Sequence, residues 1–245
     1  MVEGAKPIFE LLQRAPGLIS TLVISPGFLR RQSDAAKRRL LQGTHRIFGC
    51  TDSRFGQLSD VDTPAGILAV VRQPEWDRRR YLERKTLLGI FCDRIQDPTN
   101  LGTIIRTAAG LAVDVLWLSP QCVDVFNPKV VRATAGALLE LPIFARTDLK
   151  ELSGLGLAIM GADVRYEGSR PLRSVKSRPS RTVLAIGNEG EGLSAETRAL
   201  TDLRLTIPLK NTVESLNAAS AAAIFLFHLT GLPVTEALEN TSDSR

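Results

Sequence analysis

Residues 207–229, IPLKNTVESLNAASAAAIFLFHL, are the most informative stretch of this chain. An apolar strand, predicted over Leu203–Leu209, runs into a polar loop, and the loop leads into a helix rich in alanine. The first turn of that helix is predicted to hold Ser215, Leu216 and Asn217. Because the first backbone N–H groups of a helix have no partner within the helix, they can bind a polar ligand. The stretch therefore predicts a strand–loop–helix unit with a ligand site at the start of the helix.

A second informative segment lies upstream, CDRIQDPTNLGTIIRTAAG at residues 92–110. A buried strand over Leu87–Cys92 is expected to lead into a turn and then a helix, with Thr99 or Asn100 as its cap. Arg106 follows six residues after Asn100, so the two side chains do not share one stripe of the helix. A capping side chain can still point back over the pocket that the arginine faces. The alternative is an ordinary strand–turn–helix unit with a surface arginine.

The third segment is LAIGNEGEGLS at residues 184–194, in which three glycines follow a predicted strand. Glycine lets the backbone approach a ligand closely, and this spacing differs from the GxGxxG fingerprint of dinucleotide-binding proteins. Glu189 is placed at the carboxyl end of a buried strand, where α/β sheets bind their ligands. Glu191 is the less informative of the two carboxylates. A plain glycine-rich turn would explain the glycines but not Glu189.

Composition limits the kinds of protein that this chain can be. It has 245 residues, 44% of them hydrophobic, which suits an ordinary globular protein. We find no apolar run that could span a bilayer and no signal peptide. The three cysteines, Cys50, Cys92 and Cys122, are odd in number and widely spaced, which favours buried free thiols in a reducing compartment. With only two histidines, no metal site is expected. We therefore expect a soluble, cytoplasmic protein.

Positive charge is concentrated in the N-terminal third. Residues 1–85 carry 15 Lys and Arg against 9 Asp and Glu, whereas the remainder carries 16 against 17. Such an excess attracts nucleic-acid phosphates without regard to sequence. Many of these cations fall on a helix predicted over Phe28–Leu41, which is either a solvated surface or a face that contacts phosphates. The candidates for RNA contact on this helix are Arg30, Arg31, Lys37 and Arg38.

The pattern of elements predicts an α/β protein with two domains. Short strands over Thr21–Ser25, His45–Cys50 and Ile67–Val71 alternate with helices in residues 1–73. A charged linker is expected at residues 74–85. From residue 86 to residue 235, near-continuous apolar runs predict strands buried on both faces of a parallel sheet. Residues 236–245 are polar and are expected to form a disordered tail.

In order and spacing, the three segments closely resemble the motifs of the SpoU/TrmH family of RNA ribose methyltransferases, over about residues 86–230. The N-terminal region resembles the L30e-like substrate-binding domain that often precedes this catalytic domain, at VEGAKPIFELL (residues 2–12) and DTPAGILAVV (residues 62–71). The resemblance implies an α/β trefoil-knot domain of the SPOUT superfamily behind a small α/β L30e-like domain. It also implies a homodimer with active sites near the interface and no membrane association.

The resemblance further implies S-adenosylmethionine as the methyl donor and a ribose 2′-hydroxyl as the acceptor. The residues implied in catalysis are Asn100, Arg106, Glu189, Ser215 and Asn217. The residues implied in holding the cofactor are Gly187, Gly190, Ile207, Leu209 and Leu216. Arg132, in a segment that also resembles the family, is either an RNA contact, a support for the pocket or a helix-surface charge.

Because arginine stays protonated far above neutral pH, we expect Arg106 to bind a phosphate and stabilise developing negative charge rather than act as a base. The N-terminal domain favours a structured RNA, 23S-type ribosomal RNA before transfer RNA. The alternatives are a transfer RNA methyltransferase and a non-catalytic RNA-binding or ribosome-assembly protein of the same fold. A nucleotide-dependent oxidoreductase would need the GxGxxG fingerprint, which we do not find.

Overall fold

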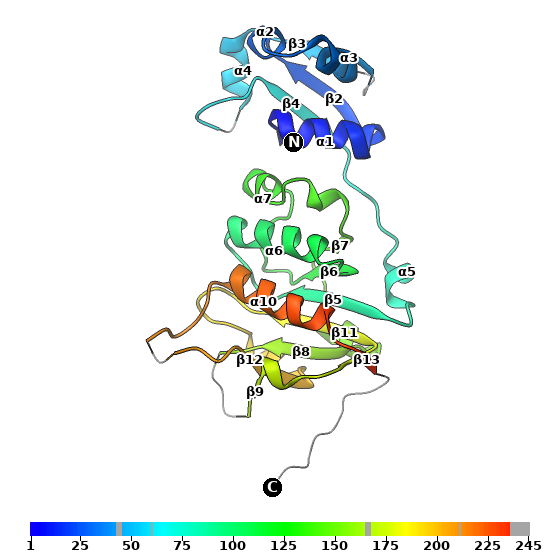
Figure 1. Ribbon diagram of the computed structural model, residues 1–245, viewed down its shortest axis with the longest axis vertical. Coiled ribbons are helices and arrows are strands. Elements are labelled where there is room, and N and C mark those ends of the chain that lie inside the picture. The colour runs from blue at the N-terminus through cyan, green and yellow to red at the C-terminus, as the bar shows by residue number, and fades with distance from the viewer. Residues whose placement is uncertain (43–45, 60, 165–167, 211, 236–245) are drawn as a thin grey trace.

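A computed structural model of the protein describes residues 1–42, 46–59, 61–164, 168–210 and 212–235. The chain forms a small N-terminal sheet with helices and a larger C-terminal sheet with helices on both faces (Figure 1). The tail predicted at residues 236–245, and His45 in the predicted strand His45–Cys50, lie outside the described residues. Among the described residues, no helix is both long and apolar enough to cross a membrane.

The N-terminal sheet has the strand order β1-β4-β2-β3. Its core packs Ile8 and Leu11 of the first helix against Leu22 and Ile67 of the central strands. The elements of this part are β1 (Val2–Glu3), α1 (Ala5–Arg14), η1 (Pro16–Leu18), β2 (Ile19–Ile24), α2 (Pro26–Arg30), α3 (Asp34–Gln42), β3 (Ile47–Gly49), α4 (Asp52–Leu58) and β4 (Ile67–Val71).

The single helix predicted over Phe28–Leu41 is wrong, because the structure divides it in two. Helix α2 ends at Arg30 and α3 begins at Asp34. The Ser33 side chain accepts the N–H of Ala36 over 3.3 Å and so caps a new helix. Arg30 therefore lies on α2, Arg31 lies in the turn between the helices, and Lys37 and Arg38 lie on α3.

The predicted linker at residues 74–85 contains a short helix, α5 (Arg78–Leu82). Tyr81 on α5 packs against Phe144 of the C-terminal sheet, with ring centroids 6.1 Å apart. Figure 1 shows this segment running down one side of the molecule. It is thus packed against the C-terminal domain, while the domain boundaries at residues 73 and 86 stay predictions.

The C-terminal sheet has seven strands in the order β7-β6-β5-β11-β8-β12-β9, and every neighbouring pair is parallel. This confirms the parallel sheet and the α/β class. Its strands are β5 (Leu87–Cys92), β6 (Val115–Leu118), β7 (Ile143–Phe144), β8 (Ala158–Ala162), β9 (Arg170–Pro171), β11 (Arg181–Ile186) and β12 (Leu203–Thr206). The strand predicted to end at Leu209 therefore ends three residues earlier, at Thr206.

Helices cover both faces of this sheet. Side chains of α6 (Pro98–Gly110) and α10 (Ala218–Thr230) pack in the core on one face, and α8 (Leu149–Gly154) packs on the other. The remaining elements are α7 (Pro128–Ala133), η2 (Ala137–Leu139), η3 (Leu172–Ser174), α9 (Ala195–Ala199), and the parallel pair β10 (Arg178–Pro179) and β13 (Val234–Thr235). The close packing of α6 beside α10 brings the first and third sequence motifs together.

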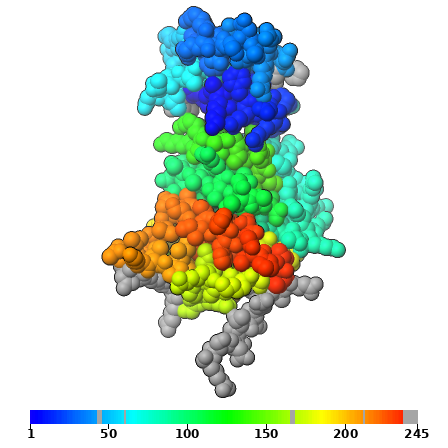
Figure 2. Space-filling model, in the orientation of Figure 1, coloured from blue at the N-terminus to red at the C-terminus, as the bar shows by residue number. Residues whose placement is uncertain are grey.

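The two domains touch through η2. Leu139 packs against the N-terminal core, and Glu140 pairs with Arg14 of α1. Figure 2 shows the N-terminal domain resting directly on the segment that contains α7 and η2. The N-terminal domain is thus in contact with the layer that carries α6.

Candidate functional site

The helix of the first motif begins differently from the prediction. Helix α6 is capped by Asp97, whose carboxylate accepts the N–H groups of Thr99 and Asn100 over 2.6 and 3.4 Å. The expectation that Thr99 or Asn100 caps the helix is therefore wrong. Because Asp97 satisfies the free N–H groups, the side chain of Asn100 can make other bonds. Asn100 is 7% exposed.

Asn100 joins the three sequence motifs. Its Nδ2 donates to Oε1 of Glu189 over 3.1 Å, and its Oδ1 accepts from Nδ2 of Asn217 over 2.8 Å. Three side chains that lie far apart in the sequence therefore form one hydrogen-bonded chain. A buried amide bonded at both ends has a fixed orientation, so this chain also fixes the side chains of Glu189 and Asn217.

Asn217 also determines where α10 starts. Its Oδ1 accepts the N–H groups of Ala219 and Ser220 over 3.0 and 3.2 Å, which makes it the N-cap. The prediction that Ser215, Leu216 and Asn217 lie in the first turn is therefore wrong, because the helix begins at Ala218. Ser215 and Leu216 belong to the loop that precedes the helix.

The carboxylate of Glu189 is surrounded by donors. Beyond Asn100, it accepts the backbone N–H of Asp97 over 3.0 Å and that of Gln96 over 3.3 Å. Desolvation acts to raise the pKa of Glu189, but the hydrogen bonds from Asn100 and these amides outweigh it, and the pKa lies below its usual value. Glu189 is therefore ionised at neutral pH and fixed in position.

The loops after β5 and β11 are tied to each other. Asp93 accepts the N–H of Ser194 over 2.7 Å, and Arg94 pairs with Glu191. This pairing raises the pKa of Arg94. Gly187 is packed so closely that a Cβ there would lie 2.1 Å from the carbonyl carbon of Gly192. These contacts hold the glycine-rich loop in one conformation.

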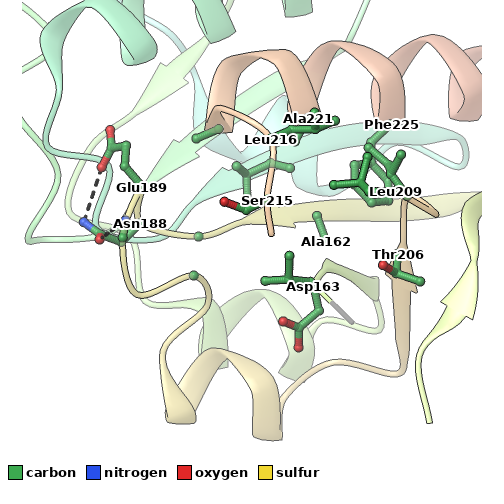
Figure 3. Close-up of a pocket in the computed structure, with 17 residues that line it drawn as sticks. Ala162, Asp163, Asn188, Glu189, Thr206, Leu209, Ser215, Leu216, Ala221 and Phe225 are labelled. Atoms are coloured by element: carbon green, nitrogen blue, oxygen red, sulfur yellow. Dashed lines mark hydrogen bonds between the residues drawn. The ribbon is translucent and has the colours of Figure 1, made fainter. Parts of the chain in front are cut away.

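A pocket of about 110 Å³ opens between this loop and the loop that follows β12 (Figure 3). Figure 3 shows Asn188 and Glu189 at one side, Leu209 and Phe225 at the other, and Ser215 and Leu216 between them. All five residues that the resemblance implied for the cofactor line this pocket: Gly187, Gly190, Ile207, Leu209 and Leu216.

The sequence reasoning missed part of the pocket wall. Ala162 and Asp163, at the carboxyl end of β8, also line the pocket, as do Thr206 and Phe225. The apolar run that predicts β8 does not reveal that this strand lies between β11 and β12. Once that order is known, its carboxyl end becomes an expected position for a ligand.

A wider cleft of about 780 Å³ adjoins the pocket and shares five residues with it: Asn188, Glu189, Ser215, Leu216 and Ala218. Four of the residues implied in catalysis line this cleft: Asn100, Glu189, Ser215 and Asn217. The structure thus brings together a partly apolar pocket and an open, polar cleft. Glu189 lies on the wall that the two spaces share, and Asn100 and Asn217 continue the hydrogen-bonded chain along the cleft. Such a pair of spaces can hold a small molecule in the pocket and present one end of it to a larger ligand in the cleft.

Arg106 is the exception among the residues implied in catalysis. It is exposed on α6 and lines neither the pocket nor the cleft. Instead it faces a space between the domains, with Lys6 and Arg14 of α1. Within the described part of the chain its guanidinium has no hydrogen bond or ion pair. A single chain therefore does not bring Arg106 to Asn100.

The cations proposed to contact RNA are divided between the domains. Arg30 pairs with Asp52 over 3.7 Å and Lys37 with Asp34 over 3.3 Å. Helices α2 and α3 and the turn between them, which carry the four N-terminal cations, lie at the end of the molecule farthest from β8 and β12 (Figure 1). The N-terminal set is Arg30, Arg31, Lys37 and Arg38. Arg132 is exposed on α7.

Comparison with known proteins places this geometry in a family. Residues 88–227 match the model of the SpoU rRNA Methylase family. The chain belongs to this family. Among curated SpoU relatives, it is 32% identical over 234 residues to the Bacillus subtilis 23S rRNA (guanosine(2553)-2′-O)-methyltransferase RlmP, covering 94% of this chain and 88% of that protein. A Streptomyces viridochromogenes 23S rRNA (uridine(2479)-2′-O)-methyltransferase is 31% identical over 182 residues, 68% of this chain and 60% of that one.

The fold agrees with solved SpoU structures. The SpoU methyltransferase AviRb from Streptomyces viridochromogenes, in complex with AdoMet, superposes with a TM-score of 0.78 at 30% identity, covering 94% of this chain and 88% of that chain. The expected fold class and the family resemblance are therefore confirmed, and this chain is an enzyme of the SpoU methyltransferase family. The L30e-like nature of the N-terminal domain stays a prediction. No cluster of three or more metal-binding side chains occurs within the described ranges.

Proposed function

We propose that this chain transfers the methyl group of S-adenosylmethionine to a ribose 2′-hydroxyl in large-subunit ribosomal RNA. The observation that carries the proposal is that the pocket and the cleft meet at Glu189, which a hydrogen-bonded chain joins to Asn100 and Asn217 in the cleft. This arrangement presents a bound methyl donor to an RNA strand in the adjoining cleft.

The pocket residues suit this methyl donor. Leu209, Leu216 and Phe225 offer apolar surface for a nucleoside base, and Thr206 and Asp163 offer polar atoms at the opposite wall. When bound, S-adenosylmethionine supplies an electrophilic methyl group on a sulfonium. At Gly187 the missing Cβ makes room for the backbone of Gly192, which shapes the loop at the edge of the pocket.

The cleft residues orient the acceptor. Methyl transfer needs the 2′-hydroxyl oxygen in line with the methyl group, and holding that geometry contributes much of the rate. Ser215 lies where pocket and cleft meet, and Asn217 lines the cleft, where its hydrogen bond to Asn100 keeps it from rotating. Glu189, fixed and ionised, gives the wall of the cleft a permanent negative charge.

We further propose that the enzyme works as a homodimer in which Arg106 of one chain completes the cleft of its partner. Phe227 and Ile224 on the outer face of α10 are 73% and 44% exposed, an apolar surface suited to a second copy. Arg106 is exposed on the neighbouring helix α6. In the cleft of the partner chain, the guanidinium of Arg106 would bind a phosphate and stabilise negative charge on the 2′-oxygen.

Mixed dimers test this arrangement. Arg106→Ala and Asn217→Ala variants, each inactive alone, are mixed in equal amounts after dissociation. If the arginine acts across the interface, half of the dimers are mixed and each has one intact site, so about a quarter of wild-type activity returns. If Arg106 acts within its own chain, no activity returns. Sedimentation of the wild-type chain as a monomer would also exclude the dimer.

Ribosomal RNA is favoured by the extent of the similarity. AviRb matches 94% of this chain, including the N-terminal domain. A solved structure described by its work on 2-OH methylation of C/U34 on tRNA matches only 59% of this chain, while 94% of its own length is covered. The N-terminal domain is thus shared with the rRNA enzymes. The similarity to the Bacillus subtilis enzyme over 94% of this chain supports the cytoplasm as the place where it acts.

A transfer assay tests the proposed function. Labelled S-adenosylmethionine is incubated with unmodified large-subunit RNA, small-subunit RNA and transfer RNA in separate reactions, and 2′-O-methyl positions are mapped. We expect label in large-subunit RNA with the wild-type chain and none with Asn100→Ala. Label confined to transfer RNA would show that large-subunit ribosomal RNA is not the substrate. Absence of S-adenosylmethionine binding, measured by calorimetry, would exclude the methyltransferase reaction itself.

A further inference from the structure

The reaction cleft contains one cation to which no role is assigned. Lys129 lines the cleft together with Asn100, Glu189 and Asn217. It is exposed, and its ammonium group forms no ion pair within the described part of the chain. Arg106, the cation that the family resemblance implied for this site, lies outside this cleft.

The charges of the cleft make this lysine significant. Two carboxylates line the cleft, Asp97 and Glu189, and Glu189 is ionised. Lys129 is the one Lys or Arg among the described residues that line it. An RNA strand that brings a ribose to this wall also brings a negatively charged phosphodiester on each side of that ribose. Without a cation, the carboxylates would repel these phosphates.

The backbone of Lys129 is held in a fixed position relative to Asn100. The Asn127 side chain caps α7 by accepting the N–H of Lys129 over 2.9 Å. Helix α7 touches α6 at Gly102, where a Cβ would lie 2.4 Å from that of Ala133. The base of the lysine is therefore rigid, while its four-carbon stem lets the ammonium group follow a phosphate.

We propose that Lys129 binds a phosphodiester that flanks the target ribose and so positions the 2′-hydroxyl against the wall formed by Asn100, Glu189 and Asn217. This inference rests on the proposed function and names a contact with the substrate of that same site. Lys129 is a positioning residue: it neutralises a phosphate and takes no proton from the reacting hydroxyl. Arg132, exposed one turn later on α7, extends the positive surface beyond the cleft.

The test compares Lys129→Gln, Lys129→Arg and the wild-type chain. Lys150→Gln is the matched control, because Lys150 is exposed on α8, which packs on the other face of the sheet. Binding of a large-subunit RNA fragment is measured between about 50 and 300 mM salt, and methyl transfer is measured on the same fragment. Log K falls as log salt rises, and the loss of one phosphate contact should make this slope less steep by about 0.7 to 0.9.

We expect Lys129→Gln to raise KM for RNA about tenfold, because one charged hydrogen bond is lost, and to leave S-adenosylmethionine affinity and Tm unchanged. Lys129→Arg should restore most of the loss, and Lys150→Gln should behave as wild type. An unchanged salt slope for Lys129→Gln, or an equal change for Lys150→Gln, would overturn the inference. If the wild-type chain transfers no methyl group but the slopes still differ, the proposed function fails while the phosphate contact stands.

Discussion

Asn217 and Asn100 are 117 residues apart in the chain, yet Nδ2 of Asn217 donates to Oδ1 of Asn100 over 2.8 Å. The bond joins the cap of α10 to the first turn of α6, and Asn100 in turn donates a hydrogen bond to Glu189. This one amide therefore fixes the three motifs relative to one another along the wall of the cleft.

Asn100→Asp should weaken both the fold and the reaction. The new carboxylate cannot donate to Glu189, and it places a second negative charge beside that residue. Loss of a buried donor costs about 1–3 kcal/mol, so the free energy of unfolding in urea should fall by that amount. Methyl transfer should fall by more than tenfold. Thr103→Ala, an exposed change on the same helix, is the control, and equal effects for both variants would contradict the role of Asn100.

Gly187→Ala should abolish binding of S-adenosylmethionine. A Cβ at Gly187 would lie 2.1 Å from the backbone of Gly192, so the glycine-rich loop would have to move. Gly190→Ala is a matched control in the same loop, because its Cβ would meet only Oδ1 of Asn188, at 3.7 Å. Calorimetric titration should show a loss of at least tenfold in affinity for Gly187→Ala and a small change for Gly190→Ala. Similar affinities for the two variants would show that close packing at Gly187 is unimportant.

Glu189→Gln should change how stability depends on pH. The pKa of Glu189 is lower in the folded chain than in the unfolded chain, where it is about 4.3. Its contribution to stability is therefore complete above that value and is lost as the pH falls through the lower, folded pKa. The difference in Tm between wild type and Glu189→Gln should be largest near neutral pH and shrink toward pH 3. A difference that does not vary with pH would mean that the charge of Glu189 does not stabilise the loop.

Arg178→Met should destabilise the C-terminal end of the fold. The buried guanidinium donates to the carbonyl oxygens of Leu229 and Pro179 over 3.3 and 3.2 Å. Burial lowers the pKa of this guanidinium. Without Arg178 these carbonyls keep the bonds from the N–H of Leu232 and the hydroxyl of Thr182, and the loss of a charged hydrogen bond costs about 1.5–3 kcal/mol. Denaturation in urea should show this loss, whereas Arg173→Met, at an exposed position, should leave stability unchanged.

Several features were predictable from local sequence. The apolar runs at β5 and β11 predict strands buried on both faces, and the structure pairs them in a parallel sheet. The five residues implied for the cofactor do line one pocket. Helix boundaries were less predictable, because they depend on which side chain makes the cap. Helix α6 is capped by Asp97 and not by Thr99 or Asn100. Ser33 caps a second helix inside the segment that was predicted as one.

The sequence by itself determined the class of fold and the family, because strand patterns and motif spacing are local properties, and it pointed to Asn100, Glu189 and Asn217 as candidates for the site. Only the tertiary structure decided that Asn100 bonds to both Glu189 and Asn217, that Lys129 enters the cleft, and that Arg106 lies outside it. These relationships depend on the order of strands in the sheet and on how α6 packs against α7 and α10. Contacts between side chains as much as 117 residues apart are set by that packing, which no local pattern contains.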